Sequence, residues 1–124
     1  MRTVKTILLV EDDPNQGWLY EEELSDEGYL ILRASDGPEA LKLVEENHLD
    51  CIVMDINIPG DGVDALRHML LRRPQLRVVI NTAYPSYEDA FADWPVNPDA
   101  YVVKSSDLTE LKSRVRETLA KSHS

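Results

Sequence analysis

The stretch CIVMDINIPGDG, Cys51 to Gly62, begins as a buried strand and ends in turn residues, with Asp55 at the point where the strand stops. The run CIVM contains no charged residue, so both of its faces are predicted to be covered, as in a parallel sheet between layers of helices. Pro59, Gly60 and Gly62 then mark a loop. A carboxylate directly after such a strand therefore lies at the edge of a sheet. Its function depends on which other side chains lie at the same edge.

Strand and helix patterns alternate along the whole chain. Apolar runs predict four further strands, at residues 6–10, 29–35, 76–83 and 100–104. Helical spacing and helix-boundary residues predict five helices: one ending at Gly28, then 36–48, 63–74, around 86–94, and 106–119 with Asp107 and Glu110 as capping residues. The alternation, without a hairpin signal, predicts an α/β protein whose doubly wound, five-stranded parallel sheet is covered by helices on both faces.

Composition narrows the classes of partner. The chain has 124 residues, enough for one domain, and its net charge of −10 is the wrong sign for direct binding to nucleic-acid phosphates. It contains no apolar run of the roughly 20 residues that a membrane span needs and no signal-peptide pattern, so we expect a cytoplasmic protein without membrane contact. The single cysteine, Cys51, is expected to be a buried core residue.

Polar side chains collect where the predicted strands end. Ligands of open parallel sheets bind outside the carboxyl ends of the strands. The residues found there are Glu11, Asp12, Asp13, Asp55, Thr82 and Lys104. Several acids at one edge repel one another unless Lys104 or a cation offsets their charge, and Mg²⁺ prefers such oxygen ligands. The sequence therefore predicts a divalent-metal site with room for a phosphoryl group.

These residues stand in four motifs, LLVEDDP, VMDINIPGDG, NTA and YVVK. Their combination, in this order and at strand ends, resembles the receiver domain of two-component response regulators over essentially the whole chain. The resemblance implies a flavodoxin-like fold with strand order 2-1-3-4-5. It also implies a single receiver domain over residues 1–124, with a core of about residues 5–120. Only AKSHS follows Leu119, so we expect no output domain in this chain, which is either a stand-alone receiver or a fragment of a longer regulator.

The resemblance assigns roles to individual residues. Asp55 would accept a phosphoryl group from a sensor histidine kinase or a phosphotransfer protein, while Thr82 and Lys104 would bind the phosphoryl oxygens. The implied ligands of Mg²⁺ or Mn²⁺ are Glu11, Asp12, Asp55 and the backbone carbonyl of Asn57. Asp13 lies one place past the acidic pair and is expected at the surface or at a helix N-terminus.

The resemblance also implies a switch. Thr82 would move toward the phosphoryl group and Tyr101 would turn inward, which changes the surface formed by the fourth helix, the fifth strand and the fifth helix. That surface would bind a downstream protein that the sequence does not identify. Trp18 and Trp94 are explained equally well as part of a partner surface and as packing residues.

Four positions depart from the family pattern. Ser105 replaces the proline that usually follows the lysine, so the Lys104–Ser105 peptide is predicted to be trans. The PGDG turn is one residue shorter than usual, which predicts a tighter loop beside Asp55. Asn81 is expected to be a buried amide with its hydrogen bonds satisfied, and the bulk of Tyr84 favours slow loss of phosphate.

Two other classes of function remain open. A small Mg²⁺-dependent phosphohydrolase would also use an aspartyl phosphate, but that pattern has a second acid where this chain has Asn57. A receiver-like interaction module that is never phosphorylated would not need the set of Asp55, Thr82 and Lys104. We therefore expect a signalling phosphoacceptor that catalyses only its own phosphorylation and dephosphorylation, and not an enzyme.

Overall fold

A parallel sheet forms the centre of the molecule in the computed structural model, which describes residues 4–83 and 98–121. Its strands are β1 (Thr6–Val10), β2 (Leu30–Ala34), β3 (Cys51–Met54), β4 (Val78–Thr82) and β5 (Ala100–Val103). All neighbours pair in parallel and the order is β2-β1-β3-β4-β5. The predicted doubly wound, flavodoxin-like sheet with order 2-1-3-4-5 is confirmed.

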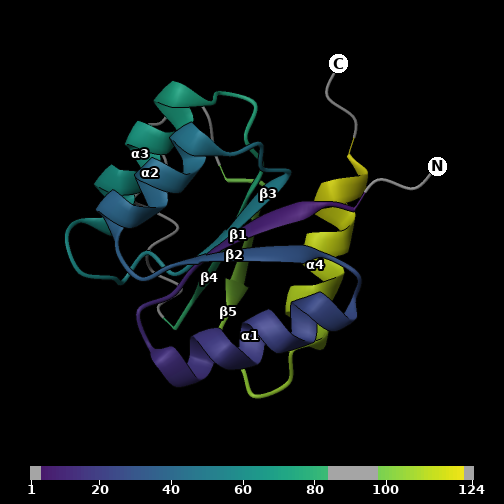
Figure 1. The fold of residues 1–124 in the computed structure, drawn as a ribbon. Helices are drawn as coiled ribbons and strands as arrows, with labels where there is room; N and C mark the ends of the chain where they lie inside the picture. The colour runs from purple at the N-terminus through teal and green to yellow at the C-terminus, as the bar shows by residue number, and fades with distance from the viewer. Residues whose placement is uncertain (1–3, 84–97, 122–124) are drawn as a thin grey trace.

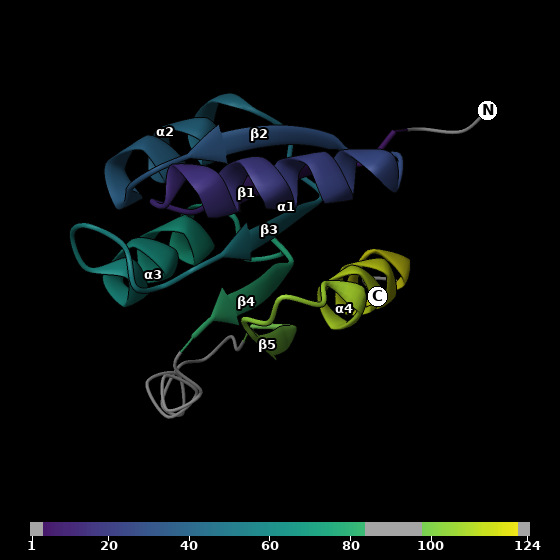
Figure 2. The same ribbon diagram turned by 90° about the horizontal axis from the view of Figure 1, so that it is seen from below.

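The helices cover both faces of this sheet. They are α1 (Pro14–Asp26), α2 (Gly37–Glu46), α3 (Gly62–Arg72) and α4 (Thr109–Ala120). Helices α2 and α3 lie on one face and α1 and α4 on the other (Figures 1 and 2). The helix predicted around residues 86–94, with Tyr84 and Trp94, lies outside the described residues, so α4 corresponds to the last of the five predicted helices. In the described part of the chain, no helix has the length and apolar character needed to cross a membrane.

Each buried strand contributes to two separate cores. In β1, Leu8 and Val10 pack into the core under α2 and α3, whereas Ile7 and Leu9 pack into the core under α1 and α4. The same alternation holds in β3, where Cys51 is fully buried as predicted. Because successive side chains point to opposite faces and both faces are covered, these strands are apolar at every position from Ile7 to Val10 and from Cys51 to Met54.

The helix ends follow local capping chemistry, with one correction. The Asp13 side chain caps α1, and Gly28 follows the end of that helix with a φ of 98°, as the sequence predicted. The last helix, however, begins at Thr109 and not at residue 106. Asp107 Oδ1 accepts hydrogen bonds from the backbone N–H and the hydroxyl of Thr109, which forms a turn before the helix, and the N-cap residue Leu108 offers no side-chain oxygen. The predicted capping role of Asp107 was therefore wrong.

Arg77 fixes the opposite end of α4, a contact that the sequence did not indicate. Its Nη1 donates to the carbonyl oxygens of Thr118 at 3.1 Å and Leu119 at 2.8 Å, and its Nη2 donates to that of Lys121. The last carbonyl groups of a helix have no partner within the helix. Arg77, just before β4, satisfies them and ties the end of α4 to the sheet.

Candidate functional site

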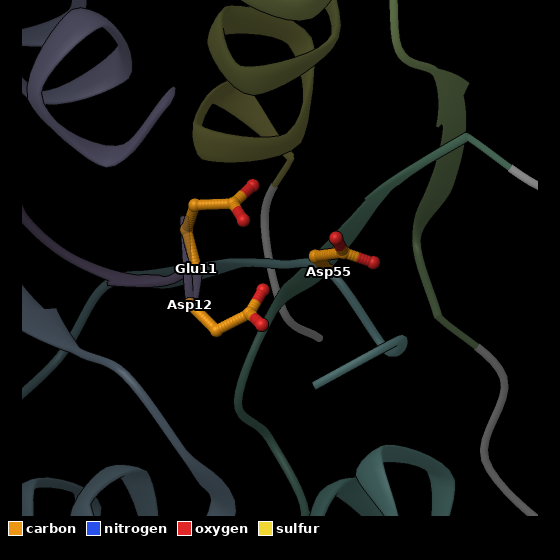
Figure 3. A group of neighbouring side chains, drawn as sticks. All are labelled: Glu11, Asp12 and Asp55. Atoms are coloured by element: carbon orange, nitrogen blue, oxygen red, sulfur yellow. The ribbon is translucent and has the colours of Figure 1, made fainter. Parts of the chain in front are cut away.

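Three carboxylates meet at the carboxyl edge of the sheet. Glu11 and Asp12 follow β1 and Asp55 follows β3, and these two strands are neighbours. One carboxylate oxygen from each residue lies within 4.8 Å of the others. Figure 3 shows the side chains of Glu11 and Asp12 extending toward Asp55. Glu11 and Asp55 are buried and Asp12 is exposed, so the cluster opens to solvent on the side of Asp12.

Lys104 brings a positive charge into this cluster from the end of β5. Its ammonium lies 2.7 Å from Asp55 Oδ2 and 2.8 Å from Glu11 Oε1, and only 13% of its side chain is exposed. Its backbone N–H donates to the carbonyl of Thr82 at 2.8 Å. The pairing of β4 with β5 therefore fixes the backbone position from which the Lys104 side chain extends. The Lys104–Ser105 peptide is trans, as predicted.

The charges in the cluster affect one another. Burial raises the pKa of the Glu11 carboxyl, and the attraction of Lys104 opposes this shift only in part. Burial by itself would lower the pKa of the Lys104 ammonium, but its contacts with Asp55 and Glu11 outweigh burial and raise that pKa above its ordinary value. The lysine therefore remains charged and offsets part of the negative charge of the acids.

One carboxylate oxygen in the cluster has an unused acceptor site. Glu11 Oε1 is buried and makes no directed hydrogen bond within the described residues, although it forms an ion pair with Lys104. In the described part of the chain, three carboxylates meet one ammonium, which leaves excess negative charge, and the ligand atoms of this cluster are all oxygens. Both properties fit a hard divalent cation such as Mg²⁺. The residues of this edge can therefore hold the metal that the sequence predicts.

The loop after Asp55 folds back closely on itself. The Asn57 N–H donates to Asp55 Oδ1 at 2.9 Å and so orients the carboxylate. At the start of α3, a Cβ on Gly62 would lie only 2.0 Å from the carbonyl oxygen of Ile56. Gly62 therefore allows the first turn of α3 to contact the residue after Asp55. The proposed use of the Asn57 carbonyl as a metal ligand stays a prediction.

The two candidate switch residues lie on adjacent strands. Thr82 is the last residue of β4 and is only 2% exposed. Tyr101 of β5 is in register with Ile80, is half-buried, and packs against the core under α2 and α3. The neighbour of Thr82, Asn81, is buried and has the Tyr20 side chain of α1 as a partner. Among the described residues, neither of its amide atoms is a buried group without a hydrogen-bond partner, as predicted.

Sequence reasoning missed Gln16, which contacts the cluster, and did not decide the role of Trp18. Gln16 Oε1 in the first turn of α1 accepts a hydrogen bond from the Lys104 ammonium at 2.7 Å. These residues are 88 positions apart, so their contact depends on how α1 packs on the sheet, which no local pattern encodes. Trp18, two positions further along α1, is 61% exposed, which excludes a role in core packing. Asp13 caps α1 as expected and is not in the carboxylate cluster.

Glu11→Gln will stabilise the metal-free fold at neutral pH. The folded-state pKa of Glu11 lies above its ordinary 4.5, so this acid favours folding while it is protonated and loses that contribution as pH rises through the folded-state pKa. Glutamine resembles the protonated acid at every pH. Urea unfolding in a chelator should therefore show a higher midpoint for Glu11→Gln at neutral pH, and the difference from the parent should vanish below pH 4.5. Equal midpoints at neutral pH would contradict this account of Glu11 burial.

Comparison with known proteins places this arrangement in a family. The family model described as the response regulator receiver domain matches residues 7–116. The chain belongs to the response regulator receiver domain family. The match includes every candidate site residue from Glu11 to Lys104, so the acid cluster and its lysine lie within a receiver domain.

Relatives of this receiver domain include both longer and similarly sized proteins. It is 37% identical over 110 residues to YrkP, an uncharacterized transcriptional regulatory protein of Bacillus subtilis, covering 88% of this chain and 47% of YrkP. The chain thus spans about half the length of that relative. It is 30% identical to sporulation initiation phosphotransferase F of Bacillus subtilis, covering 91% of this chain and 92% of that protein.

Solved structures of one response regulator resemble the whole fold. TrrA of Thermotoga maritima in complex with Mg²⁺-BeF is 36% identical, with a TM-score of 0.85 and coverage of 93% of this chain and 99% of TrrA. The structure of TrrA in complex with the histidine kinase ThkA gives a TM-score of 0.83, again at 36% identity. This match covers 95% of this chain and 100% of the chain in that structure.

Proposed function

We propose that this receiver domain accepts a phosphoryl group on Asp55, from a histidine kinase or a phosphotransfer protein, while Mg²⁺ or Mn²⁺ is bound. The observation that carries the proposal is the meeting of three carboxylates with the Lys104 ammonium at one sheet edge, where the Asp55 carboxylate is 2.7 Å from that ammonium. The TrrA structures, one with Mg²⁺-BeF and one with a histidine kinase, support the same reading. The expected location is the cytoplasm, and the downstream protein is unidentified.

The residues of the site suit phosphoryl transfer in which positioning and charge do most of the catalysis. A carboxylate oxygen of Asp55 would form a bond to phosphorus as the bond from phosphorus to the donor's imidazole nitrogen breaks. The electron pair stays on that nitrogen, which takes up a proton.

The residues around Asp55 would position it for this transfer. The Asn57 N–H holds Asp55 Oδ1 at 2.9 Å and limits rotation of the carboxylate. The metal would be held by Glu11, Asp12, Asp55 and the Asn57 carbonyl. Its positive charge would offset the negative charge of the phosphoryl oxygens.

Lys104 and Thr82 would then bind the product. The Lys104 ammonium, now on Asp55 Oδ2, would follow the negative charge onto a phosphoryl oxygen, and the Thr82 hydroxyl would donate to another. Movement of Thr82 would open space beside Ile80 and Tyr101, which are paired across β4 and β5. Tyr101 would turn into that space and change the surface around β5 that a target protein reads.

A small-molecule phosphodonor tests this proposal. Incubation with phosphoramidate and Mg²⁺ should add one phosphoryl group to the parent chain, detected by intact mass, and none to Asp55→Asn, which keeps the shape of the side chain without its charge. Addition of a chelator should also prevent the gain. A folded, Mg²⁺-binding parent that gains nothing would contradict the proposal and favour an interaction module that is never phosphorylated. A parent chain that gains no mass but releases phosphate over many turnovers would instead favour a phosphohydrolase.

A further inference from the structure

Among the described residues, three side-chain oxygens lie within 2.8 Å of the Lys104 ammonium, and one of them carries no charge. Asp55 Oδ2 lies at 2.7 Å and Glu11 Oε1 at 2.8 Å, and both belong to carboxylates. The third is the amide oxygen of Gln16, at 2.7 Å. This contact is as short as that with Asp55, so Gln16 is a full hydrogen-bond partner of the lysine and not a remote neighbour.

The first turn of α1 holds Gln16 in a defined place. Asp13 Oδ1 accepts hydrogen bonds from the backbone N–H groups of Asn15 and Gln16, at 2.9 and 3.2 Å. Gly17 is buried beneath the Arg33 side chain, so closely that a Cβ there would lie 2.2 Å from Nη2. These contacts fix the helix start from two sides. The Gln16 side chain therefore begins from a backbone that is already positioned against the sheet.

The segment after Lys104 offers much less restraint. Strand β5 ends at Val103, and Ser105, Ser106 and Asp107 are all exposed. The backbone N–H of Lys104 is bound to Thr82, but its long side chain has four rotatable carbon–carbon bonds beyond that point. The direction of the ammonium is therefore set by its acceptors and not by the loop that follows it.

The two charged acceptors change during the proposed reaction, and the neutral one does not. A divalent cation on Glu11 and Asp55 competes for the same carboxylates and repels the ammonium, and phosphorylation removes the Asp55 carboxylate itself. An amide oxygen keeps its acceptor strength through both events. Among the contacts described for this ammonium, that with Gln16 is the one able to persist.

We propose that Gln16 is a positioning residue that keeps the Lys104 ammonium at the phosphorylation site when the charges of Asp55 and Glu11 are neutralised. The inference rests on the proposed function, because the lysine needs this restraint only if a phosphoryl group arrives at Asp55. Gln16 acts through Lys104 and takes no direct part in the chemistry.

The test compares two substitutions of Gln16. Gln16→Met keeps the length of the side chain but removes the acceptor, whereas Gln16→Glu restores an acceptor oxygen. The first readout is the rate at which the Lys104 ammonium protons exchange with water, followed by ¹⁵N NMR of lysine-labelled chain with saturating Mg²⁺ and no phosphodonor, so that the metal competes for Asp55 and Glu11. The second is the rate of phosphoryl uptake from phosphoramidate. Asn15→Met, in the same exposed turn, serves as control.

Gln16→Met should accelerate exchange of the Lys104 ammonium protons and slow phosphoryl uptake, each by roughly 10-fold, which corresponds to loss of one hydrogen bond to a charged group. Gln16→Glu should restore slow exchange, and Asn15→Met should behave as the parent. If the parent takes up phosphate and Gln16→Met matches it in both rates, the inference is overturned and the proposed function stands. Slower uptake with unchanged exchange also overturns it, because the effect then does not pass through Lys104. If the parent takes up no phosphate, the proposed function fails and this inference fails with it.

Discussion

Asp12→Asn will weaken Mg²⁺ binding by about 100-fold, because it removes one of three negative charges whose oxygens lie within 4.8 Å of one another. Asparagine keeps the shape of the side chain and an acceptor oxygen, so the loss reports on charge. Asp12 is the exposed member of the cluster, and its replacement should leave the stability of the metal-free chain almost unchanged. Isothermal titration calorimetry with Mg²⁺ measures the affinity directly.

Asp13→Asn is the matched control for this result. The two aspartates are adjacent in sequence, but Asp13 caps α1 and does not belong to the carboxylate cluster. Asparagine is as good an N-cap as aspartate, so the helix should be retained. Parental Mg²⁺ affinity in Asp13→Asn, beside the large loss in Asp12→Asn, is the expected pair of results. Equal losses in both variants would mean that Mg²⁺ responds to the general negative charge of the surface and not to this site.

Lys104→Met will change metal binding and phosphorylation in opposite directions. Removal of an ammonium that lies 2.7 Å from Asp55 and 2.8 Å from Glu11 leaves both carboxylates free for a cation, so Mg²⁺ should bind about 10-fold more tightly. Phosphoryl uptake from phosphoramidate should nevertheless become about 100-fold slower, because the transferred oxygens lose a preorganised donor. Calorimetry and intact mass measure the two effects on the same samples.

Lys112→Met provides the comparison for Lys104. Lys112 forms an ion pair of the same length, 2.7 Å, with Glu23, but it joins α4 to α1 away from the carboxylate cluster. Its replacement should leave both Mg²⁺ affinity and phosphoryl uptake unchanged. If Lys104→Met reduced Mg²⁺ affinity, the lysine would be needed to shape the metal site, and the proposed competition between ammonium and metal would be wrong.

The sheet could be predicted from sequence because its signal is local. The runs ILLV and CIVM are apolar at each position, and burial on both faces of a parallel sheet requires this pattern. The turn residues that follow then identify which side chains stand at the carboxyl edge. The sequence alone therefore predicts that Glu11, Asp12, Asp55 and Lys104 lie together, and the structure does bring them together.

Contacts between distant helices and strands could not be predicted in this way. Gln16 meets Lys104, and Arg77 meets the carbonyl oxygens at the end of α4, only after α1 and α4 have packed on the sheet. The start of α4 was misplaced for a local reason. An aspartate before a helix can cap it or form a separate turn. Asp107 forms such a turn by accepting hydrogen bonds from Thr109.

Amide NMR of the chain during titration with beryllofluoride, in the presence and absence of Mg²⁺, tests the central claim most directly. Beryllofluoride on a carboxylate stands in for a phosphoryl group, and TrrA has been crystallised with Mg²⁺-BeF. The account predicts shifts around Asp55, Thr82 and Tyr101 only when Mg²⁺ is present, and none in Asp55→Asn. A folded parent chain that shows no shifts with Mg²⁺ and beryllofluoride would contradict the account.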